Sequence, residues 1–278
     1  MNKISSIDSI VTSIAEIRNL RNGFITNFFL DYSKHKVWMN HHALYTEKIG
    51  DTLFLIKKND TFWNVFFASI SPEELNQAYS NLEERYPDVT MIVDIVGRKN
   101  ECVHTVSVLN GLLPYKYCQL VRMSRILYPD NVCKLSEEVS YATLEQVEEV
   151  YSYLNVFFDE KTEQIPYIEE LRDYADKQHI LIYMKGLRIA GFVVFEKSKM
   201  LLYLRYWFVH PDFRKQGIGS KLLHQFFYEG RETKRNQLWV ICSNENAIKR
   251  YIHYGFKEEN LYDFVITNKN KKYEGENN

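Results

Sequence analysis

The sequence is short of the features that mark several large classes of protein. Acidic and basic residues nearly cancel to a net charge of −1, so there is no bulk electrostatic case for binding nucleic acid or an anionic membrane surface. No apolar run reaches membrane-spanning length, and no signal-peptide pattern is present. The cysteines lack CxxC or metal-ligand spacing, which indicates a reducing compartment; they are Cys102, Cys118, Cys133 and Cys242. We therefore expect a cytoplasmic protein without a metal, a nucleic-acid partner or a membrane partner.

Glycine is also scarce, and its placement is uneven. The chain has 11 glycines, and none of them lies between residues 51 and 96. Gly217 and Gly219, by contrast, follow an apolar stretch over 201–209 and precede a helical pattern. A strand, a glycine turn and a helix together present free backbone N–H groups and a positive helix end to a phosphate. This stretch is predicted to hold a phosphorylated cofactor, with added positive charge from Arg214 and Lys215.

Hydrophobic periodicity and turn residues divide the rest of the chain into short strands and helices. Ser71, Pro72 and Glu74 have the spacing of a capping box at a helix start. An amphipathic helix near the N-terminus is expected to pack on its own domain. Helices are predicted over 4–20, 71–85, 101–109, 144–153, 166–177 and 246–254, with one more beginning at Ile218. Strands are predicted over 52–56, 62–69, 89–96, 115–125, 138–141, 179–184, 187–195, 201–209, 237–242 and 261–267.

The order of these elements repeats once along the chain. Each half runs from hairpin strands through a helix, a strand, a second helix and a glycine to a final strand. Asn100 precedes Gly111 by the interval at which Asn244 precedes Gly255. The alternative is that many α/β domains share such an order without being copies of each other.

The repeat predicts an α/β chain of two domains, each a mixed central sheet flanked by helices. The boundary is expected in the segment 125–135, around Pro129. Residues 1–130 would be a degenerate copy without the phosphate loop, and residues 131–268 the competent domain. The polar tail over 269–278 is expected to be disordered.

Two motifs in the second half resemble the signature of the GNAT N-acetyltransferase superfamily. The run VHPDFRKQGIG is similar to the family's acetyl-CoA motif, (Gln/Arg)-x-x-Gly-x-(Gly/Ala), which Arg214, Gly217 and Gly219 meet. The run NENAIKRYIHYGF, which begins at Asn244, is similar to the family's Asn followed by a helix with a Tyr and then Gly-Phe. The resemblance implies the GNAT acyl-CoA N-acyltransferase fold, here in a tandem form whose first half is degenerate.

The resemblance covers about residues 136–267 and implies acetyl-CoA as cosubstrate and no metal. Backbone amides of residues 215–220 would hold the pyrophosphate, and Tyr251 would protonate the leaving thiolate as general acid. A main-chain N–H where the central strand diverges from its neighbour, that of Val209, would polarise the thioester carbonyl. The residues implied in cofactor binding are Phe208, Val209, Arg214, Lys215, Gln216, Gly217, Ile218, Gly219, Ser220, Asn244 and Tyr251.

The sequence does not identify the general base. Many members of the family carry a Glu on or near the central strand, but residues 201–209 contain no carboxylate. A lysine-type amine must lose a proton before it attacks. Water, His210, Asp159 and Glu163 are the alternatives, and an acceptor that is already neutral would need no base.

The predicted function is that of a CoA-dependent N-acetyltransferase, an acyltransferase with a small-molecule or peptide amine as acceptor. The protein would act as a monomer or a homodimer. The missing carboxylate suggests an alternative, a non-catalytic CoA-binding sensor or scaffold. The first half would close the acceptor side, pack like the partner subunit of a GNAT dimer, or bind a macromolecular acceptor.

Overall fold

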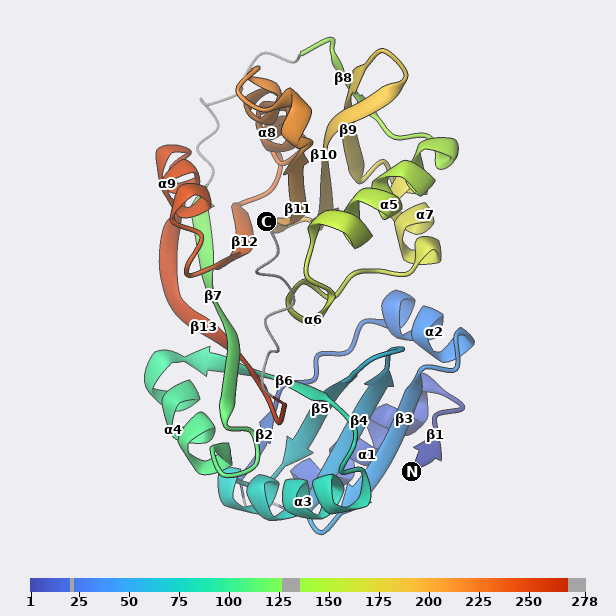
Figure 1. The fold of residues 1–278 in the computed structure, drawn as a ribbon, viewed down its shortest axis with the longest axis vertical. Helices are drawn as coiled ribbons and strands as arrows, with labels where there is room; N and C mark the ends of the chain where they lie inside the picture. Colours follow the sequence, from blue (N-terminus) through green and yellow to red (C-terminus); the bar gives the residue numbers. More distant parts are fainter. Residues whose placement is uncertain (21–22, 127–135, 270–278) are drawn as a thin grey trace, which may run out of the picture. The chain divides into compact units, whose positions relative to one another are not determined.

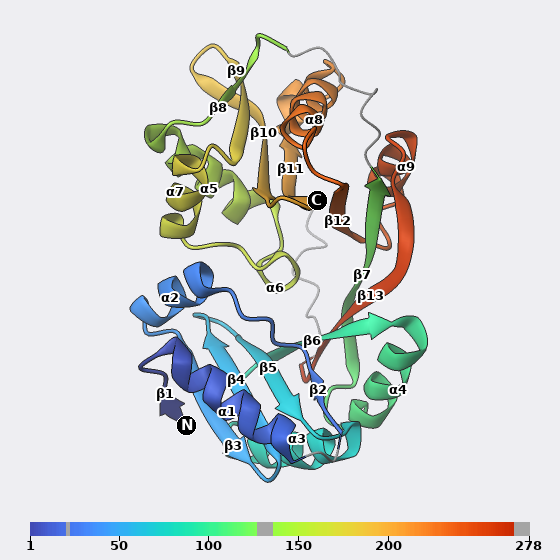
Figure 2. The same ribbon diagram turned by 180° about the vertical axis from the view of Figure 1, so that it is seen from behind.

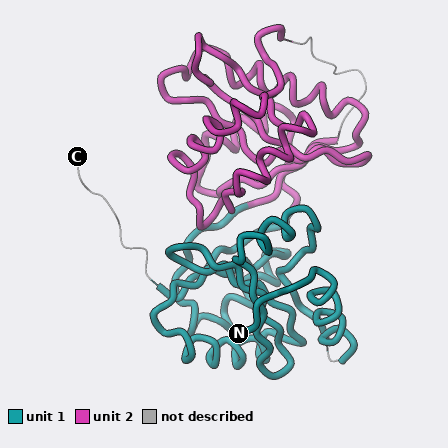
Figure 3. Tube along the Cα trace, turned by 90° about the vertical axis from the view of Figure 1, so that its right-hand side faces the viewer, with its two compact units in different colours: residues 1–120, 260–278 teal, residues 121–259 magenta. Residues whose placement is uncertain are grey.

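The computed structural model describes residues 1–20, 23–126 and 136–269, which form a mixed α/β fold (Figure 1). The chain divides into two compact units, which Figure 3 colours separately. Unit 1 consists of residues 1–120 together with 260–278, and unit 2 consists of residues 121–259. Within the described part of the chain, no helix combines the length and the apolar character needed to cross a membrane.

Unit 1 is a sheet with helices on both faces. Its strands follow the order β1-β3-β4-β5-β6-β13, and β2 pairs with β5 beside this path. Helices α3 and α4 cover one face, over a core that includes Phe54, Leu75 and Ile95. Helix α1 covers the other face, where Ile17 packs against Leu53 (Figure 2). The elements are β1 (Asn2–Lys3), α1 (Ile7–Asn19), β2 (Ile25–Thr26), α2 (Tyr32–Asn40), β3 (Leu44–Ile49), β4 (Thr52–Lys58), β5 (Trp63–Ser69), α3 (Pro72–Arg85), β6 (Met91–Arg98), α4 (Lys99–Leu109), β7 (Tyr115–Ile126) and β13 (Lys257–Thr267).

The start of α3 shows how the local sequence sets a helix boundary. The Ser71 side chain accepts a hydrogen bond from the N–H of Glu74 at 3.1 Å, and Pro72 lies in the first turn, as predicted. The other half of the predicted capping box is wrong. The Glu74 carboxylate instead accepts from the N–H of Asp51 at 2.8 Å, and so ties the helix to the β3–β4 turn.

Unit 2 has a similar arrangement. Its strands follow the order β7-β12-β11-β10-β9-β8. Helices α5 and α7 pack on one face over a core that includes Val150, Leu171 and Phe192. Helix α8 covers the other face, where a Cβ on Gly191 would lie 3.3 Å from Cγ2 of Ile218, so glycine permits close packing. The elements are β8 (Val139–Tyr141), a 3₁₀ turn (Leu144–Gln146), α5 (Val147–Phe157), α6 (Glu160–Glu163), α7 (Ile168–Asp176), β9 (Ile180–Lys185), β10 (Arg188–Lys197), β11 (Leu201–Val209), a 3₁₀ turn (Pro211–Phe213), α8 (Ile218–Glu229), β12 (Arg235–Ile241) and α9 (Glu245–His253).

The last strand of each unit comes from the other half of the sequence. Residues 261–267 of β13 pair antiparallel with residues 92–98 of β6 in unit 1, and the end of β7, beyond residue 120, belongs to unit 2. With this exchange, the strand orders of the two units correspond position by position. The domain boundary expected between residues 130 and 131 assigns each final strand to its own half of the sequence. In the structure, each compact unit instead takes its final strand from the other half. The boundary was expected within residues 125–135, of which 127–135 lie outside the described residues. The disordered tail was expected over residues 269–278, of which 270–278 also lie outside them.

Candidate active site

The two parallel strands at the centre of unit 2 separate before they end. Residues 201–204 of β11 pair with residues 235–238 of β12. β11 then continues to Val209 and β12 to Ile241 without further pairing between them. The result is an opening between two main chains, of the kind in which an extended ligand can pair with a free strand edge.

A β-bulge in β11 decides which side chains face this opening. The pairing with β10 shifts between Val194, which lies opposite Tyr206, and Phe195, which lies opposite Leu204. Arg205 is therefore the extra residue. A bulge changes the alternation of side chains along a strand, so residues after Arg205 face the opposite side from the one that a regular strand would give them.

After the bulge, Trp207 and Val209 face α8. A Cβ on Gly219 would lie 3.0 Å from Cζ2 of Trp207 and 3.4 Å from Cγ2 of Val209. Glycine at this position therefore lets the start of the helix approach the strand. Phe208 faces the other way and is buried in the core under α5, where its ring packs on Phe192.

The main-chain groups of the same residues point into the opening. The N–H of His210 donates to the carbonyl of Ala190 at 2.9 Å, which identifies a hydrogen-bonded pair between β11 and β10. Hydrogen-bonded and non-bonded pairs alternate along an antiparallel ladder. The N–H and C=O of Trp207 and Val209 therefore face away from β10 and toward the separated β12, whereas those of Phe208 are used in the ladder.

The start of α8 carries unpaired amide groups. Its N-cap is Gly217, with φ of 75°, and no side chain caps the helix. The first helical bond runs from the N–H of Lys221 to the carbonyl of Gly217, so the amides of residues 218–220 have no partner within the helix. Lys215 is also left-handed, with φ of 63°. Turns of this kind direct successive amides into a concavity that binds anions.

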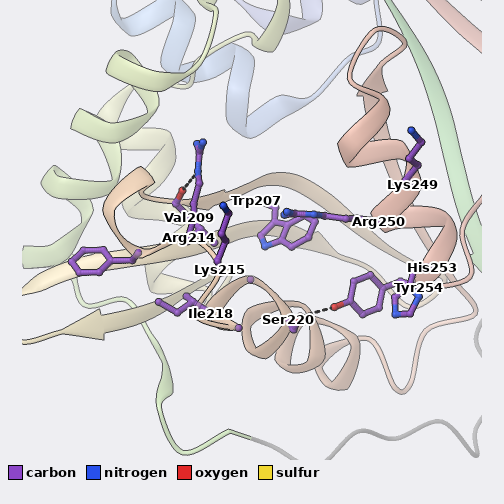
Figure 4. Close-up of a pocket in the computed structure, with 13 residues that line it drawn as sticks. Trp207, Val209, Arg214, Lys215, Ile218, Ser220, Lys249, Arg250, His253 and Tyr254 are labelled. Carbon is purple, nitrogen blue, oxygen red and sulfur yellow. Dashed lines mark hydrogen bonds between the residues drawn. The ribbon is translucent and has the colours of Figure 1, made fainter.

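A cavity of about 460 Å³ lies at this helix start. Figure 4 shows Arg214 and Lys215 on its β11 side, and Arg250 reaching from α9 toward Trp207. None of the lining residues, all of them in the described part of unit 2, is acidic. They are Trp207, Val209, Phe213, Arg214, Lys215, Gly217, Ile218, Gly219, Ser220, Lys249, Arg250, His253 and Tyr254. The cavity is therefore positively charged and suits a ligand with several negative charges.

The structure brings most of the predicted cofactor residues together. Seven of them line the cavity, and the four that do not are Phe208, Gln216, Asn244 and Tyr251. The contribution of α9 and its C-cap to the cavity was not predicted; the residues are Lys249, Arg250, His253 and Tyr254. Their i, i+4 spacing on a predicted helix was the signal that could have found them. The hydroxyl of Tyr254 also donates to the Ser220 hydroxyl at 2.9 Å, which ties the end of α9 to α8.

Tyr251 lies beside the cavity wall and is buried. Its ring centroid is 5.7 Å from that of Trp207, which lines the cavity. Burial raises the pKa of the Tyr251 phenol above its usual value, and the nearby charge of Glu163 adds to this effect. Asn244 begins the same helix, and its side-chain oxygen accepts from the N–H of Ala247 at 3.1 Å as the N-cap.

Glu163 is the carboxylate whose charge acts on Tyr251. It ends the short helix α6, and the hydroxyl of Tyr206 on β11 donates to its carbonyl at 2.9 Å. Burial, then the neighbouring charge of Asp159, raise the pKa of the Glu163 carboxyl to about 7, against an opposing effect of Arg205. Asp159 itself accepts from the N–H of Lys161 at 3.0 Å and so serves as the N-cap of α6.

His210 is occupied within its own loop. Its Nδ1 accepts from the N–H of Asp212 at 3.3 Å. The ring packs among Tyr153, Phe157 and Phe213. These contacts give the imidazole a role in holding the 3₁₀ turn after β11.

No group of three or more His, Cys, Asp or Glu residues in the described ranges is placed to hold a metal ion. The uncapped helix start, the cationic cavity and the open edge of β11 provide partners for phosphates and for an extended amide-bearing chain. The residues present therefore fit a CoA thioester.

The residues of this site lie within a stretch that is similar to known proteins. Residues 147–256 match the model of the acetyltransferase (GNAT) family. A 56-residue stretch is 38% identical to an uncharacterised N-acetyltransferase of Methanocaldococcus jannaschii; it covers 19% of this chain and only 25% of that relative. Residues 147–256 thus resemble a GNAT acetyltransferase domain, and the chain spans about a quarter of the length of the curated relative it matches.

Solved structures share the fold over a longer span. A tandem GNAT protein from the clavulanic acid biosynthesis pathway aligns over 94% of this chain and 95% of its own, with a TM-score of 0.62 and 11% identity. A GNAT-family acetyltransferase from Colwellia psychrerythraea aligns over 96% and 98%, with a TM-score of 0.56 and 12% identity. A GCN5-related N-acetyltransferase from Sphaerobacter thermophilus aligns over 78% and 76%, with a TM-score of 0.59 and 12% identity. The architecture of the chain is thus that of a tandem GNAT fold.

Proposed function

We propose that unit 2 transfers the acetyl group of acetyl-CoA to a primary amine by direct attack, with Tyr251 as general acid and Glu163 as general base. The observation that carries this proposal is the conjunction of an uncapped helix start with a cationic cavity, beside an opening between parallel strands. When bound, acetyl-CoA supplies an activated acetyl thioester.

The phosphates of the cosubstrate would be held at the start of α8. The amides of residues 218–220 point out of the helix, and the helix dipole adds positive potential there. Arg214, Lys215 and Arg250 supply charge-assisted hydrogen bonds from both sides of the cavity. Gln216 lies within the same turn, and its side chain does not line the cavity.

The open edge of β11 would pair with the amide-bearing arm of CoA. The main-chain groups of Trp207 and the N–H of Val209 face the opening, so they are available to add an extended ligand as a further strand. The carbonyl of Val209 already accepts from Nε of Arg214 at 3.3 Å. The N–H of Val209 would also donate to the thioester carbonyl oxygen, where negative charge develops during acyl transfer.

Tyr251 is suited to the role of acid. Its raised pKa keeps the phenol protonated at neutral pH, so a proton is available for the departing sulfur. Burial beside Trp207 also limits the access of water to the phenol.

Glu163 is suited to the role of base. A carboxyl with a pKa near 7 is partly ionised at neutral pH and takes up a proton more readily than an ordinary carboxylate. Asp159 and His210 are already engaged by main-chain N–H groups. In the balanced step, a C–N bond forms and the C–S bond breaks. Glu163 takes one proton of the ammonium, Tyr251 gives its proton to sulfur, and the second proton lost from nitrogen restores the Tyr251 phenol.

Calorimetric titration with acetyl-CoA, followed by an assay of thiol release, tests the proposal. The variants are Gly217→Trp and, as a matched control, Gly186→Trp. Both glycines have positive φ and open space at the Cβ position, but Gly186 lies in the β9–β10 turn. We expect binding to be lost in Gly217→Trp and kept in Gly186→Trp, because only the first side chain would enter the cavity.

The acceptor panel comprises polyamines, amino acids, aminoglycosides and peptides. Binding with amine-dependent release of thiol supports the transferase. Binding without turnover of any amine would favour a CoA-binding sensor, the alternative that the absence of a carboxylate from β11 suggests. Absence of binding would overturn the cosubstrate assignment.

A further inference from the structure

Unit 1 contains a second opening between parallel strands. β5 and β6 pair only at Trp63 with Met91 and at Asn64 with Ile92, although β5 runs to Ser69 and β6 to Arg98. In the strand order of unit 1, β5 and β6 take the places that β11 and β12 take in unit 2. The opening between β5 and β6 is therefore the counterpart, within unit 1, of the opening between β11 and β12 in unit 2.

The opening in unit 1 is bridged by the side chain of Asn27. Its Oδ1 accepts from the N–H of Phe67 on β5 at 2.7 Å. Its Nδ2 donates to the carbonyl of Asp94 on β6 at 2.8 Å and lies 3.4 Å from the carbonyl of Val65 on β5. Asn27 is 6% exposed. One buried amide thus supplies partners to both strands at the place where they no longer bond each other.

The residues on either side of Asn27 complete this pairing. Ile25 and Thr26 form β2, which pairs antiparallel with Ser69 and Ala68. The hydroxyl of Thr26 donates to the carbonyl of Phe67 at 2.6 Å. Main-chain groups that face the opening would be costly to bury without partners, and this segment satisfies them.

The helix that follows β5 is closed to anions as well. The Ser71 side chain already caps the start of α3, whereas no side chain caps α8. Glu73 and Glu74 lie in the first turn of α3, where they oppose a phosphate by charge. Unit 1 therefore lacks the anion site at the helix start as well as the free strand edge.

We propose that residues 25–28 are a built-in plug, which occupies in unit 1 the place that a cofactor arm takes in unit 2. The plug makes unit 1 a permanently closed copy of the site, so the chain binds one acetyl-CoA, in unit 2. The comparison with a cofactor arm rests on the proposed function, whereas the closure itself rests on the contacts of Thr26 and Asn27.

Hydrogen exchange on the full-length protein tests the closure. The amide of Phe67 should be protected equally with and without acetyl-CoA. In Asn27→Ala, its exchange should become about 10- to 100-fold faster, because a buried amide loses its acceptor. Asn110→Ala, which removes an exposed asparagine at the end of α4, is the matched control and should leave this exchange unchanged. Unchanged exchange in Asn27→Ala would overturn the plug.

A milder variant covers the case in which Asn27→Ala does not fold. Thr26→Val keeps the shape of the side chain but removes the acceptor for the N–H of Phe28, at 3.1 Å, and the donor to Phe67. The exchange of the Phe28 amide should then become faster, while that of amides in α8 stays the same. Equal protection of Phe28 in wild type and Thr26→Val would contradict the pairing.

Calorimetric stoichiometry tests the consequence for ligand binding. One acetyl-CoA per chain is expected in wild type, and still one in Thr26→Val, because α3 has no anion site to recruit a second. Two per chain would overturn the proposal. If acetyl-CoA does not bind at all, the proposed function fails, whereas the exchange of the Phe67 amide still decides whether the opening is closed.

Discussion

The ring of Trp207 lies 5.7 Å from the ring of Tyr251, centroid to centroid. The same indole borders the charged cavity and leaves little room for a side chain at position 219 of α8, which is glycine. One side chain of β11 therefore contacts both helices that carry the proposed chemistry. The bulge at Arg205 is the reason, because without it residue 207 would face the core under α5.

Replacement of Tyr251 by phenylalanine should lower kcat about 100-fold or more, because the leaving sulfur loses its proton donor. The KM for acetyl-CoA should change little, since the phenol does not line the cavity. Steady-state thiol release gives both constants. Tyr228→Phe, at the far end of α8, is the control with the same loss of a hydroxyl. An unchanged kcat in Tyr251→Phe would rule out the acid role.

Replacement of Glu163 by glutamine should alter the pH profile as well as the rate. The base must be ionised, so kcat/KM in wild type should rise with pH through about 7, the pKa of this carboxyl. Glu163→Gln should be slower and should lose that rise, whereas Glu160→Gln, an exposed change in the same helix, should keep it. A rise that persists in Glu163→Gln would assign the titration to another group.

Replacement of Arg250 by alanine should raise the KM for acetyl-CoA about 10- to 100-fold, the effect of losing a hydrogen bond to a charged group. The effect should shrink as ionic strength rises, and it should be small with acetylpantetheine, which lacks the phosphates. Arg172→Ala on α7, an exposed arginine that pairs with Glu148, is the control. Equal losses with both thioesters would show that Arg250 does not contact phosphate.

Replacement of Gly217 by alanine should separate strain from binding. A left-handed backbone costs a non-glycine residue about 1–2 kcal/mol, and Gly186→Ala, also with positive φ, should lose similar stability in thermal unfolding. Only Gly217→Ala should weaken acetyl-CoA binding, since its backbone turns the amides of α8 toward the cavity. Equal affinities of the two variants for acetyl-CoA would show that the turn at Gly217 does not take part in binding.

Replacement of Asp263 by asparagine should change how the stability of unit 1 depends on pH. Burial, with the nearby charge of Asp94, raises the pKa of Asp263 well above its usual value. The unfolded chain ionises near pH 3.9 while the folded chain keeps its proton, so wild-type stability should fall as pH rises from about 4 toward the folded pKa.

Denaturant unfolding followed from pH 4 to 8 measures this effect. The stability of Asp263→Asn should not fall as pH rises, so this variant should be more stable than wild type at neutral pH. Asp88→Asn, an exposed change before β6, should retain the wild-type trend. A parallel pH dependence in wild type and Asp263→Asn would show that another group is responsible.

Much of the fold and of the candidate site followed from local sequence. The start of α3 at Ser71 and the turn at Gly217 depend on neighbours within four residues, so their positions were predictable. The short elements were not predicted, among them β2 and α6. β2 has two residues and no periodic pattern of its own, and it exists because the edge of β5 offers it partners.

The sequence by itself determined the glycine turn at Gly217, the order of most elements and the motifs of the family signature, because each depends on residues close together in the chain. The tertiary structure alone decided that Trp207 rather than Phe208 faces the cavity, since a bulge shifts the alternation of β11. It also decided that α9 supplies Arg250 and that β13 completes unit 1. Asn27 illustrates the limit most clearly. Its partners lie 38 to 67 residues away, and only the separation of β5 from β6 creates the unpaired main chain that it satisfies.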